Sequence, residues 1–225
     1  MTYAHAGASV ALASRTERDC AAAAAEITRE TGQKTMALAM DVRDAESVRS
    51  GVGRVEAEWG GVDILVASAG INIRKEVPDL TEDDWDTVVD INLKGAFLTA
   101  QAVLPGMKQR RHGRIIFLGS TLSWISLPQR AAFASSKAGI HGLTRSLALE
   151  TITEGISVNA ICPGPFATEI NKPLLDDPIK NAAFLQNVPI GRWGDPKEIR
   201  GLALYLAGPA CSFMSGSAIL IDGGW

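Results

Sequence analysis

The sequence predicts an α/β fold in which a parallel sheet is covered by helices on both faces. Short apolar runs alternate with longer helical stretches along all 225 residues. Several of these runs, such as Asp63–Ser68 (DILVAS), are nearly continuous, as expected of parallel strands that are buried on both sides. The composition does not change along the chain, and no linker or repeat interrupts it. We therefore expect one domain that spans residues 1–225.

The first half of the chain supplies three predicted strands and two helices. Ser9–Ser14 (SVALAS) is the first short strand. The alanine-rich segment Ala21–Thr31 favours a helix, and Gly32 stands where a helix ends. The next predicted elements are the strand Thr35–Met40, the helix Ala45–Trp59 and the strand Asp63–Ser68.

The second half continues this alternation. Its predicted elements are the helix Trp85–Met107, the strand Arg114–Leu118 (RIIFL), the helix Phe133–Glu150, the strand Ser157–Ile161, the helix Pro196–Leu206 and the strand Ala218–Ile221. The segment Pro163–Asp195 contains several prolines and shows no regular pattern. In a compact domain such a segment is either a lid over a site or a surface excursion.

Composition excludes several functional classes. The net charge is −3 and the sequence pI is about 5.7, which argues against the basic face that nucleic acid or an anionic membrane would require. No apolar run approaches the ~20 residues of a membrane helix, and no signal peptide is evident. The three cysteines are far apart and indicate neither a disulfide framework nor a metal site. We therefore expect a cytoplasmic protein.

Short motifs occur at the ends of the predicted strands and inside the predicted helices. Each is a weak signal alone, but their order and spacing are specific. They are Ser68-Ala69-Gly70, Asn92 in Ile91–Gly95 (INLKG), Gly119-Ser120, Lys137 in Ser135–Gly139 (SSKAG), Pro163-Gly164-Pro165 and the C-terminal Ile221–Gly224 (IDGG).

With these motifs the chain resembles the short-chain dehydrogenase/reductase family over essentially its whole length. The resemblance implies a Rossmann-like, doubly wound fold and NAD(P)(H)-linked chemistry on a carbonyl or secondary alcohol. It implies that Ser120 would hydrogen-bond the substrate oxygen. It implies that Lys137 would hold the nicotinamide ribose and would lower the pKa of a neighbouring tyrosine. Asn92 would order a water beside the lysine or serve as a structural bridge.

Two departures from the family pattern make the activity uncertain. The tyrosine that carries the proton is expected one helical turn before Lys137, but Phe133 occupies that position. Phenylalanine has no ionisable proton, so it cannot act as a general acid, and a water held by Ser120 and Lys137 would replace it less well. Phe133 is either core filling or a laboratory substitution of the family's tyrosine.

The second departure is at the start of the sequence. The residues Met1–Ser9 resemble only the end of the family's first helix, and the first strand and its glycine-rich turn are absent. In the family that strand lies between the ones predicted at Ser9–Ser14 and Asp63–Ser68. We expect the two exposed edges to close on each other, to accept a strand from another chain, or to be relieved by refolding of the N-terminal part. Alternatively, Met1 is an internal methionine of a longer protein.

The resemblance also implies a partial cofactor surface. Ser14 and Arg15 would flank the adenosine ribose, and an arginine without an acidic neighbour favours NADP(H) over NAD(H). The absence of the glycine-rich turn also allows that no nucleotide binds. The other implied contacts are Asp41, Val42, Ser68, Ala69, Gly70, Lys137, Pro163, Gly164, Phe166 and Thr168.

Three functions remain open from the sequence. The first is an oxidoreductase that is impaired or inactive in hydride transfer. The second is a non-redox descendant that binds a ligand or partner. The third is a cofactor-independent hydrolase with Ser120 as nucleophile, which lacks a Gly-x-Ser-x-Gly motif.

The substrate and the oligomeric state follow only in outline. The family resemblance implies a homodimer or homotetramer through the helices Trp85–Met107 and Phe133–Glu150. Ser123, Trp124, Phe166 and residues of the Pro163–Asp195 segment are expected to line a pocket for a small, partly apolar molecule.

Overall fold

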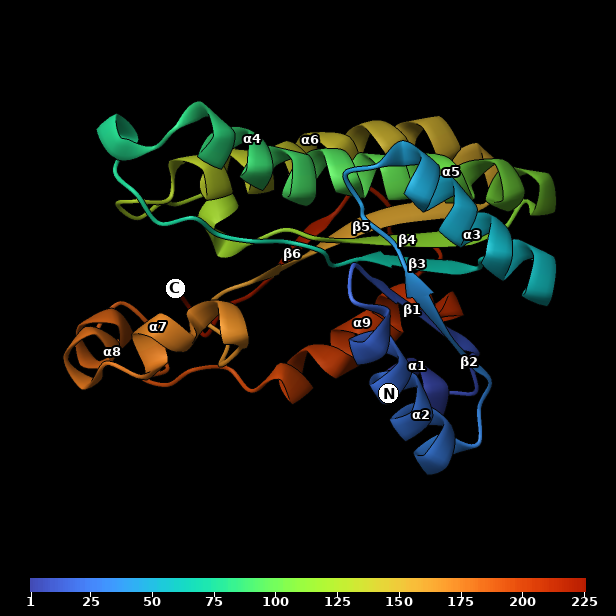
Figure 1. Cartoon of the computed structure of the whole chain (residues 1–225), viewed down its shortest axis with the longest axis horizontal. Helices are drawn as coiled ribbons and strands as arrows, with labels where there is room; N and C mark the ends of the chain where they lie inside the picture. Colours follow the sequence, from blue (N-terminus) through green and yellow to red (C-terminus); the bar gives the residue numbers. More distant parts are fainter.

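The computed structural model describes residues 1–225 and contains two parallel sheets (Figure 1). The larger sheet has the strand order β3-β4-β5-β6, and the smaller one pairs β1 with β2. All strand pairs are parallel, so the predicted α/β fold class is confirmed. The strands are β1 (Val10–Ser14), β2 (Thr35–Ala39), β3 (Ile64–Ala67), β4 (Gly113–Leu118), β5 (Ile156–Pro163) and β6 (Ala218–Ile221).

Helices cover both faces of the larger sheet (Figure 1). One layer contains α3 (Ala45–Trp59), α4 (Glu82–Val89), α5 (Gly95–Arg110) and α6 (Ala131–Thr151). The opposite side carries α9 (Arg200–Ala207), with α1 (Thr2–His5) and α2 (Glu17–Thr31) beside it. Two short helices, α7 (Lys172–Leu175) and α8 (Pro178–Leu185), lie apart from these layers.

The core lies between the larger sheet and the layer of α5 and α6. Phe117 and Ile115 of β4 pack against Met107 of α5 and Ile140 of α6, and all four are at most 1% exposed. Burial of each such side chain contributes roughly 1.5–3 kcal/mol relative to exposure. Seven of the eight residues of β5 are buried, so this strand is the centre of the fold and fixes the ends of its neighbours.

The two sheets do not join. β1 pairs only with β2, and β3 pairs only with β4, so the expectation that the two exposed edges close on each other is wrong. The strand edges are accordingly open: Ala11 and Ala13 of β1 are exposed, and Val66 of β3 is 37% exposed. One continuous sheet was expected from the alternation of elements, and the break follows from the absence of a strand between β1 and β3.

Several predicted boundaries also need correction. The helix predicted at Trp85–Met107 begins at Glu82, ends at Arg110 and passes through a π-helical turn at Asp90–Lys94. The helix predicted from Pro196 starts as a 3₁₀ turn and becomes α-helical only at Arg200. In contrast, α2 ends where expected, with Gly32 in the left-handed conformation at φ 70°. None of the helices combines the length and apolar character of a membrane-crossing segment.

Candidate functional site

A cavity of about 390 Å³ lies at the carboxyl ends of β3, β4 and β5. This is the edge at which doubly wound sheets place their ligands. Segments from the predicted lid, including α7 and α8, form another part of its wall. The predicted site residues that line it are Ser68, Gly70, Ser120, Phe133, Lys137, Pro163, Gly164, Phe166 and Thr168.

Ser120 reaches the cavity directly after β4. Its backbone is fixed by Gly119, whose N–H donates to the Ile161 carbonyl at 2.8 Å. A side chain at Gly119 would lie 2.6 Å from the Cys162 sulfur, so this close approach requires glycine. The Ser120 hydroxyl accepts a hydrogen bond from the Leu122 N–H at 3.1 Å and thereby caps a short 3₁₀ turn. Ser120 therefore lines the cavity and also has the structural role of a cap.

Lys137 is buried on α6, one turn after Phe133. Its Nζ donates to the Leu118 carbonyl at 2.7 Å and lies 5.8 Å from the centroid of the Phe133 ring. The lysine is therefore aimed at position 133, as the helical spacing predicts. Burial lowers the pKa of Lys137 to about 8.

This pKa predicts a pH-dependent stability. The folded-state pKa lies below the ordinary value of 10.5, so between pH 8 and pH 10.5 the unfolded chain retains a proton that the folded chain has lost. The free-energy cost of burying the charged lysine therefore applies in full below pH 8 and disappears as the pH rises. From pH 7 to pH 10, the free energy of unfolding of the wild type should rise by roughly 2 kcal/mol relative to Lys137→Met. Urea unfolding of both proteins measures this difference, and parallel pH profiles would contradict it.

Asn92 lies behind the cavity wall, in the π-helical turn that joins α4 to α5. Its Oδ1 accepts from the Ile71 N–H at 2.8 Å, and its Nδ2 donates to the Ile71 carbonyl and to the Ser136 hydroxyl, both at 3.0 Å. All these contacts bridge the loop after β3 to α6. Of the two expected roles, the structure displays the structural bridge.

Phe133 is half-buried, and its ring forms part of the cavity wall. The only tyrosines, Tyr3 and Tyr205, do not line the cavity. The Tyr3 hydroxyl donates to the Ala203 carbonyl at 3.1 Å and so ties α1 to α9. No tyrosine elsewhere in the fold therefore replaces the missing proton donor.

The predicted adenosine contacts lie on the smaller sheet and outside the cavity. Ser14 ends β1, and its hydroxyl accepts from the Thr16 N–H at 3.2 Å. The Asp41 carboxylate is held by Arg43 at 2.7 Å, and this hydrogen bond lowers the pKa of Asp41. The nearby charge of Arg15 lowers it further. Arg15 and Arg43 thus both lie near Asp41, but only Arg43, which the sequence did not indicate, forms an ion pair with it.

Two more of the expected contacts occupy positions outside the cavity wall. Val42 packs against Gly95 at the start of α5, where a side chain would lie 2.7 Å from Val42 Cγ2. Ala69 is exposed between Ser68 and Gly70 and does not line the cavity.

The expected substrate pocket needs correction at two residues. Ser123 and Trp124 do not line the cavity. Trp124 follows the 3₁₀ turn after Ser120, and its ring packs against His141, with ring centroids 4.1 Å apart. Of the three residues expected there, Phe166 alone is in place.

Sequence reasoning missed four polar residues of the cavity wall outside the Pro163–Asp195 segment, namely Asn72, Arg74, Thr121 and Arg130. Arg74 follows the Ser68–Gly70 motif closely, and Arg130 precedes Phe133 by less than one helical turn. Their only sequence signal was this proximity to recognised motifs.

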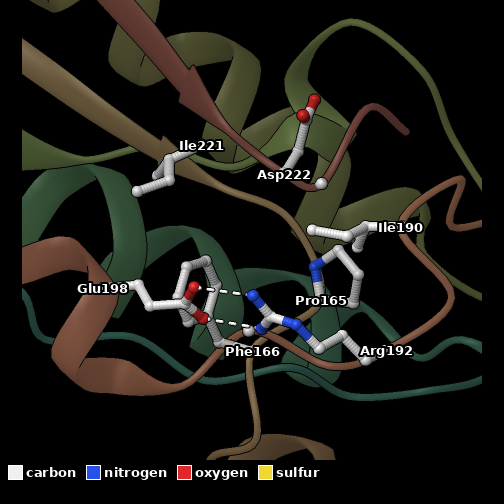
Figure 2. Close-up of a pocket in the computed structure, with 9 residues that line it drawn as sticks. Pro165, Phe166, Ile190, Arg192, Glu198, Ile221 and Asp222 are labelled. Carbon is white, nitrogen blue, oxygen red and sulfur yellow. Dashed lines mark hydrogen bonds and ion pairs between the residues drawn. The ribbon is translucent and has the colours of Figure 1, made fainter.

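A second cavity, of about 280 Å³, shares Phe166 with the first as a lining residue (Figure 2). Its walls include Pro165, Ile190 and Asp222. Arg192 reaches into it and forms two hydrogen bonds with Glu198, each 2.8 Å long. The positive charge in this cavity is therefore neutralised within the protein.

Comparisons with known proteins identify relatives of this chain. Residues 1–225 match the family model described as Enoyl-(Acyl carrier protein) reductase. The chain is 36% identical to the 3-oxoacyl-[acyl-carrier-protein] reductase FabG of Vibrio harveyi over 201 residues, which is 89% of this chain and 82% of that protein. The chain belongs to the short-chain dehydrogenase/reductase family.

Other relatives are named for sugar acids. The 2-dehydro-3-deoxy-D-gluconate 5-dehydrogenase of Escherichia coli K12 is 35% identical over 195 residues, 86% of this chain and 77% of that protein. A solved structure of gluconate 5-dehydrogenase from Burkholderia cenocepacia J2315, in complex with NADP and tartrate, superposes with a TM-score of 0.95. It is 35% identical and covers 99% of this chain and 87% of that one.

The residues of this short-chain dehydrogenase/reductase leave room for the nicotinamide end of the family's nucleotide, but they do not provide the usual site for its diphosphate. At the nicotinamide end, a side chain on Gly70 would lie 3.4 Å from Asn92 Oδ1 and 3.5 Å from Lys137 Nζ, so glycine keeps that approach open. Two buried cavity atoms, Asn72 Oδ1 and Thr121 Oγ1, have no hydrogen-bond partner within the protein. At the diphosphate position, between β1 and β3, the chain places no glycine-rich turn. The fit is therefore partial.

Proposed function

We propose that this chain binds NADP(H) and a small carbonyl or secondary-alcohol substrate at the β3–β5 cavity, and that it transfers hydride slowly because of Phe133. The observation that carries the proposal is the convergence of Ser120, Lys137 and position 133 on one cavity. The nucleotide would supply the hydride. Ser120 would donate to the substrate oxygen, and Lys137 would hold the nicotinamide ribose.

The preference for NADP(H) is supported by the charges at the end of β1. Arg15 is exposed, and Arg43 is nearby, while Asp41 is already engaged by Arg43. The Arg15 guanidinium, which forms no ion pair within the protein, suits the 2′-phosphate that distinguishes NADP from NAD. The likeness to a structure that contains NADP supports the same choice.

This preference predicts the outcome of a calorimetric titration. The wild type should bind NADPH more tightly than NADH, and Arg15→Ala should weaken NADPH binding about tenfold while NADH binding stays unchanged. Arg18→Ala is the matched control, because Arg18 is also exposed but lies in the first turn of α2, beyond the strand end. Equal affinities for the two nucleotides in the wild type would contradict the preference.

The same titration separates the proposal from a non-redox function. Phe133 and the open edges of β1 and β3 both favour a descendant that binds a ligand or partner without hydride transfer. Failure to bind either nucleotide at millimolar concentration would favour the non-redox binding protein over the oxidoreductase. The hydrolase alternative has no geometric support, because Ser120 and Lys137 hydrogen-bond to backbone groups and His141 Nε2 lies 3.4 Å from Cys162 Sγ.

We also propose that copies of this chain associate through the layer of α4, α5 and α6. Three apolar side chains of this layer, and one directly after α6, remain exposed in the single chain: Trp85, Phe97 and Leu149, with Ile152 after the helix, at exposed fractions of 38%, 42%, 82% and 42%. Their burial between copies would remove this apolar surface from water.

A further inference from the structure

The cavity at the ends of β3, β4 and β5 carries uncompensated positive charge. Arg74, Arg130 and Lys137 line it, and no aspartate or glutamate does. None of the ion pairs in the chain includes these three residues. Burial of a cation without a counter-ion lowers the free energy of unfolding. This arrangement therefore makes the folded chain less stable than a cavity wall without these charges.

Arg130 is the more buried of the two arginines. It is 8% exposed at the start of α6, and its single hydrogen bond runs from Nη1 to the carbonyl of the preceding Gln129 at 3.0 Å. Burial lowers the pKa of Arg130 to about 10, and the charge of Arg74 contributes to this effect. The other guanidinium donors have no partner within the protein.

The backbone directly before Arg130 has an unfavourable conformation at Gln129. Gln129 has φ 63°, and only one other non-glycine residue of the chain, Arg111, has a positive φ. This conformation is unfavourable for residues with a side chain and persists where the surrounding structure requires it. Here the turn comes directly before Arg130, which lines the cavity and precedes Ala131, the first residue of α6.

Arg74 approaches from the loop after β3 and is held by neutral groups. Its Nη2 donates to the Ile170 carbonyl at 2.9 Å and to Asn171 Oδ1 at 3.3 Å. These contacts fix the position of the guanidinium across the cavity from its own loop, but they leave its charge unbalanced. The second cavity provides the contrast, since Arg192 is neutralised there by Glu198 (Figure 2).

We propose that Arg74 and Arg130 together bind the carboxylate of a small hydroxy- or keto-acid substrate, with its reacting carbon beside Ser120. This inference rests on the proposed function, because it names the substrate class of the same site. The planar guanidinium fork matches a carboxylate, and a substrate without a negative charge would leave both arginines unpaired. An acyl thioester, which carries no carboxylate at the reacting end, does not meet this requirement.

The test compares two ligands that differ in charge and share their polyol chain. D-gluconate and its uncharged counterpart D-glucitol are titrated calorimetrically into the full chain, with and without NADPH. Gluconate should bind at least about tenfold more tightly than glucitol, and Arg130→Gln or Arg74→Gln should each remove that advantage while glucitol binding stays unchanged. Arg192→Gln is the matched control and should bind gluconate like the wild type.

Folding does not obscure the result. Arg130→Gln removes a buried unpaired charge, so it should unfold at the same or a higher temperature than the wild type. Tartrate, lactate and acetate are titrated in parallel, because the length of the acid is not fixed by the two arginines. Equal binding of gluconate and glucitol, retention of carboxylate binding in both arginine variants, or failure of all four acids to bind at millimolar concentration would each overturn the proposal. Carboxylate binding without nucleotide binding would refute the proposed function alone.

Discussion

Replacement of Phe133 by tyrosine is expected to raise kcat/KM for carbonyl reduction by about 10²–10⁴-fold, the range that a positioned general acid typically supplies. The Phe133 ring already lines the cavity, and Lys137 Nζ lies 5.8 Å from its centroid. A hydroxyl added to this ring would therefore enter a space that also borders Ser120. The positive charge of Lys137 would favour the phenolate and move the tyrosine into a useful protonation range.

Steady-state oxidation of NADPH at 340 nm measures this gain, with a panel of small keto acids and uncharged ketones as substrates. Phe133→Leu is the matched control, because it changes the ring without adding a proton donor, and it should show no gain. The double variant Phe133→Tyr, Lys137→Met should lose most of the gain, since the phenol would then keep an ordinary pKa. These comparisons separate acid catalysis from a change of cavity shape.

Two results would contradict this account. The first is a Phe133→Tyr variant that binds NADPH as the wild type does and still shows no increase in rate. The second is equal activation by tyrosine and leucine, which would indicate that the ring obstructs the substrate and that no proton donor is missing.

The sequence allowed the strands and the motif residues to be predicted because both depend on local patterns. Buried parallel strands appear as continuous apolar runs, and β4 was expected at Arg114–Leu118 and found at Gly113–Leu118. The motif residues lie directly after such strands or one helical turn apart, so their convergence follows from the topology. For this reason Ser120, Phe133 and Lys137 are found on one cavity, as expected.

The charged wall of the cavity could not be predicted in the same way. Arg74 and Arg130 lie on loops, and a solvated surface arginine has the same local pattern as a buried one. Only the fold shows that Gln129 takes a left-handed conformation and that Arg130 has no counter-ion. The sequence also did not decide whether β1 and β3 pair, since local patterns allowed closure of the two strand edges as well as the observed gap.

Substitution of Asn92 by alanine is expected to lower the free energy of unfolding by about 3 kcal/mol. Asn92 is 1% exposed and makes three hydrogen bonds that no other side chain can replace. Alanine would leave the N–H and the carbonyl of Ile71 without partners near the cavity wall. The Ser136 hydroxyl, which donates to the Phe133 carbonyl at 2.7 Å, would lose its only other polar contact.

Ser136→Ala provides the matched control, because it removes one of these hydrogen bonds and leaves both Ile71 groups paired with Asn92. It should cost about 1 kcal/mol in urea unfolding, well below the cost of Asn92→Ala. Amide hydrogen exchange adds a local measurement: the Ile71 N–H should lose its protection in Asn92→Ala and keep it in Ser136→Ala. Equal losses of stability in the two variants, with Ile71 still protected, would mean that Asn92 does not hold the loop after β3. The loop would then owe its position to the contacts of Arg74 with Ile170 and Asn171, and the cavity wall would be fixed from the opposite side.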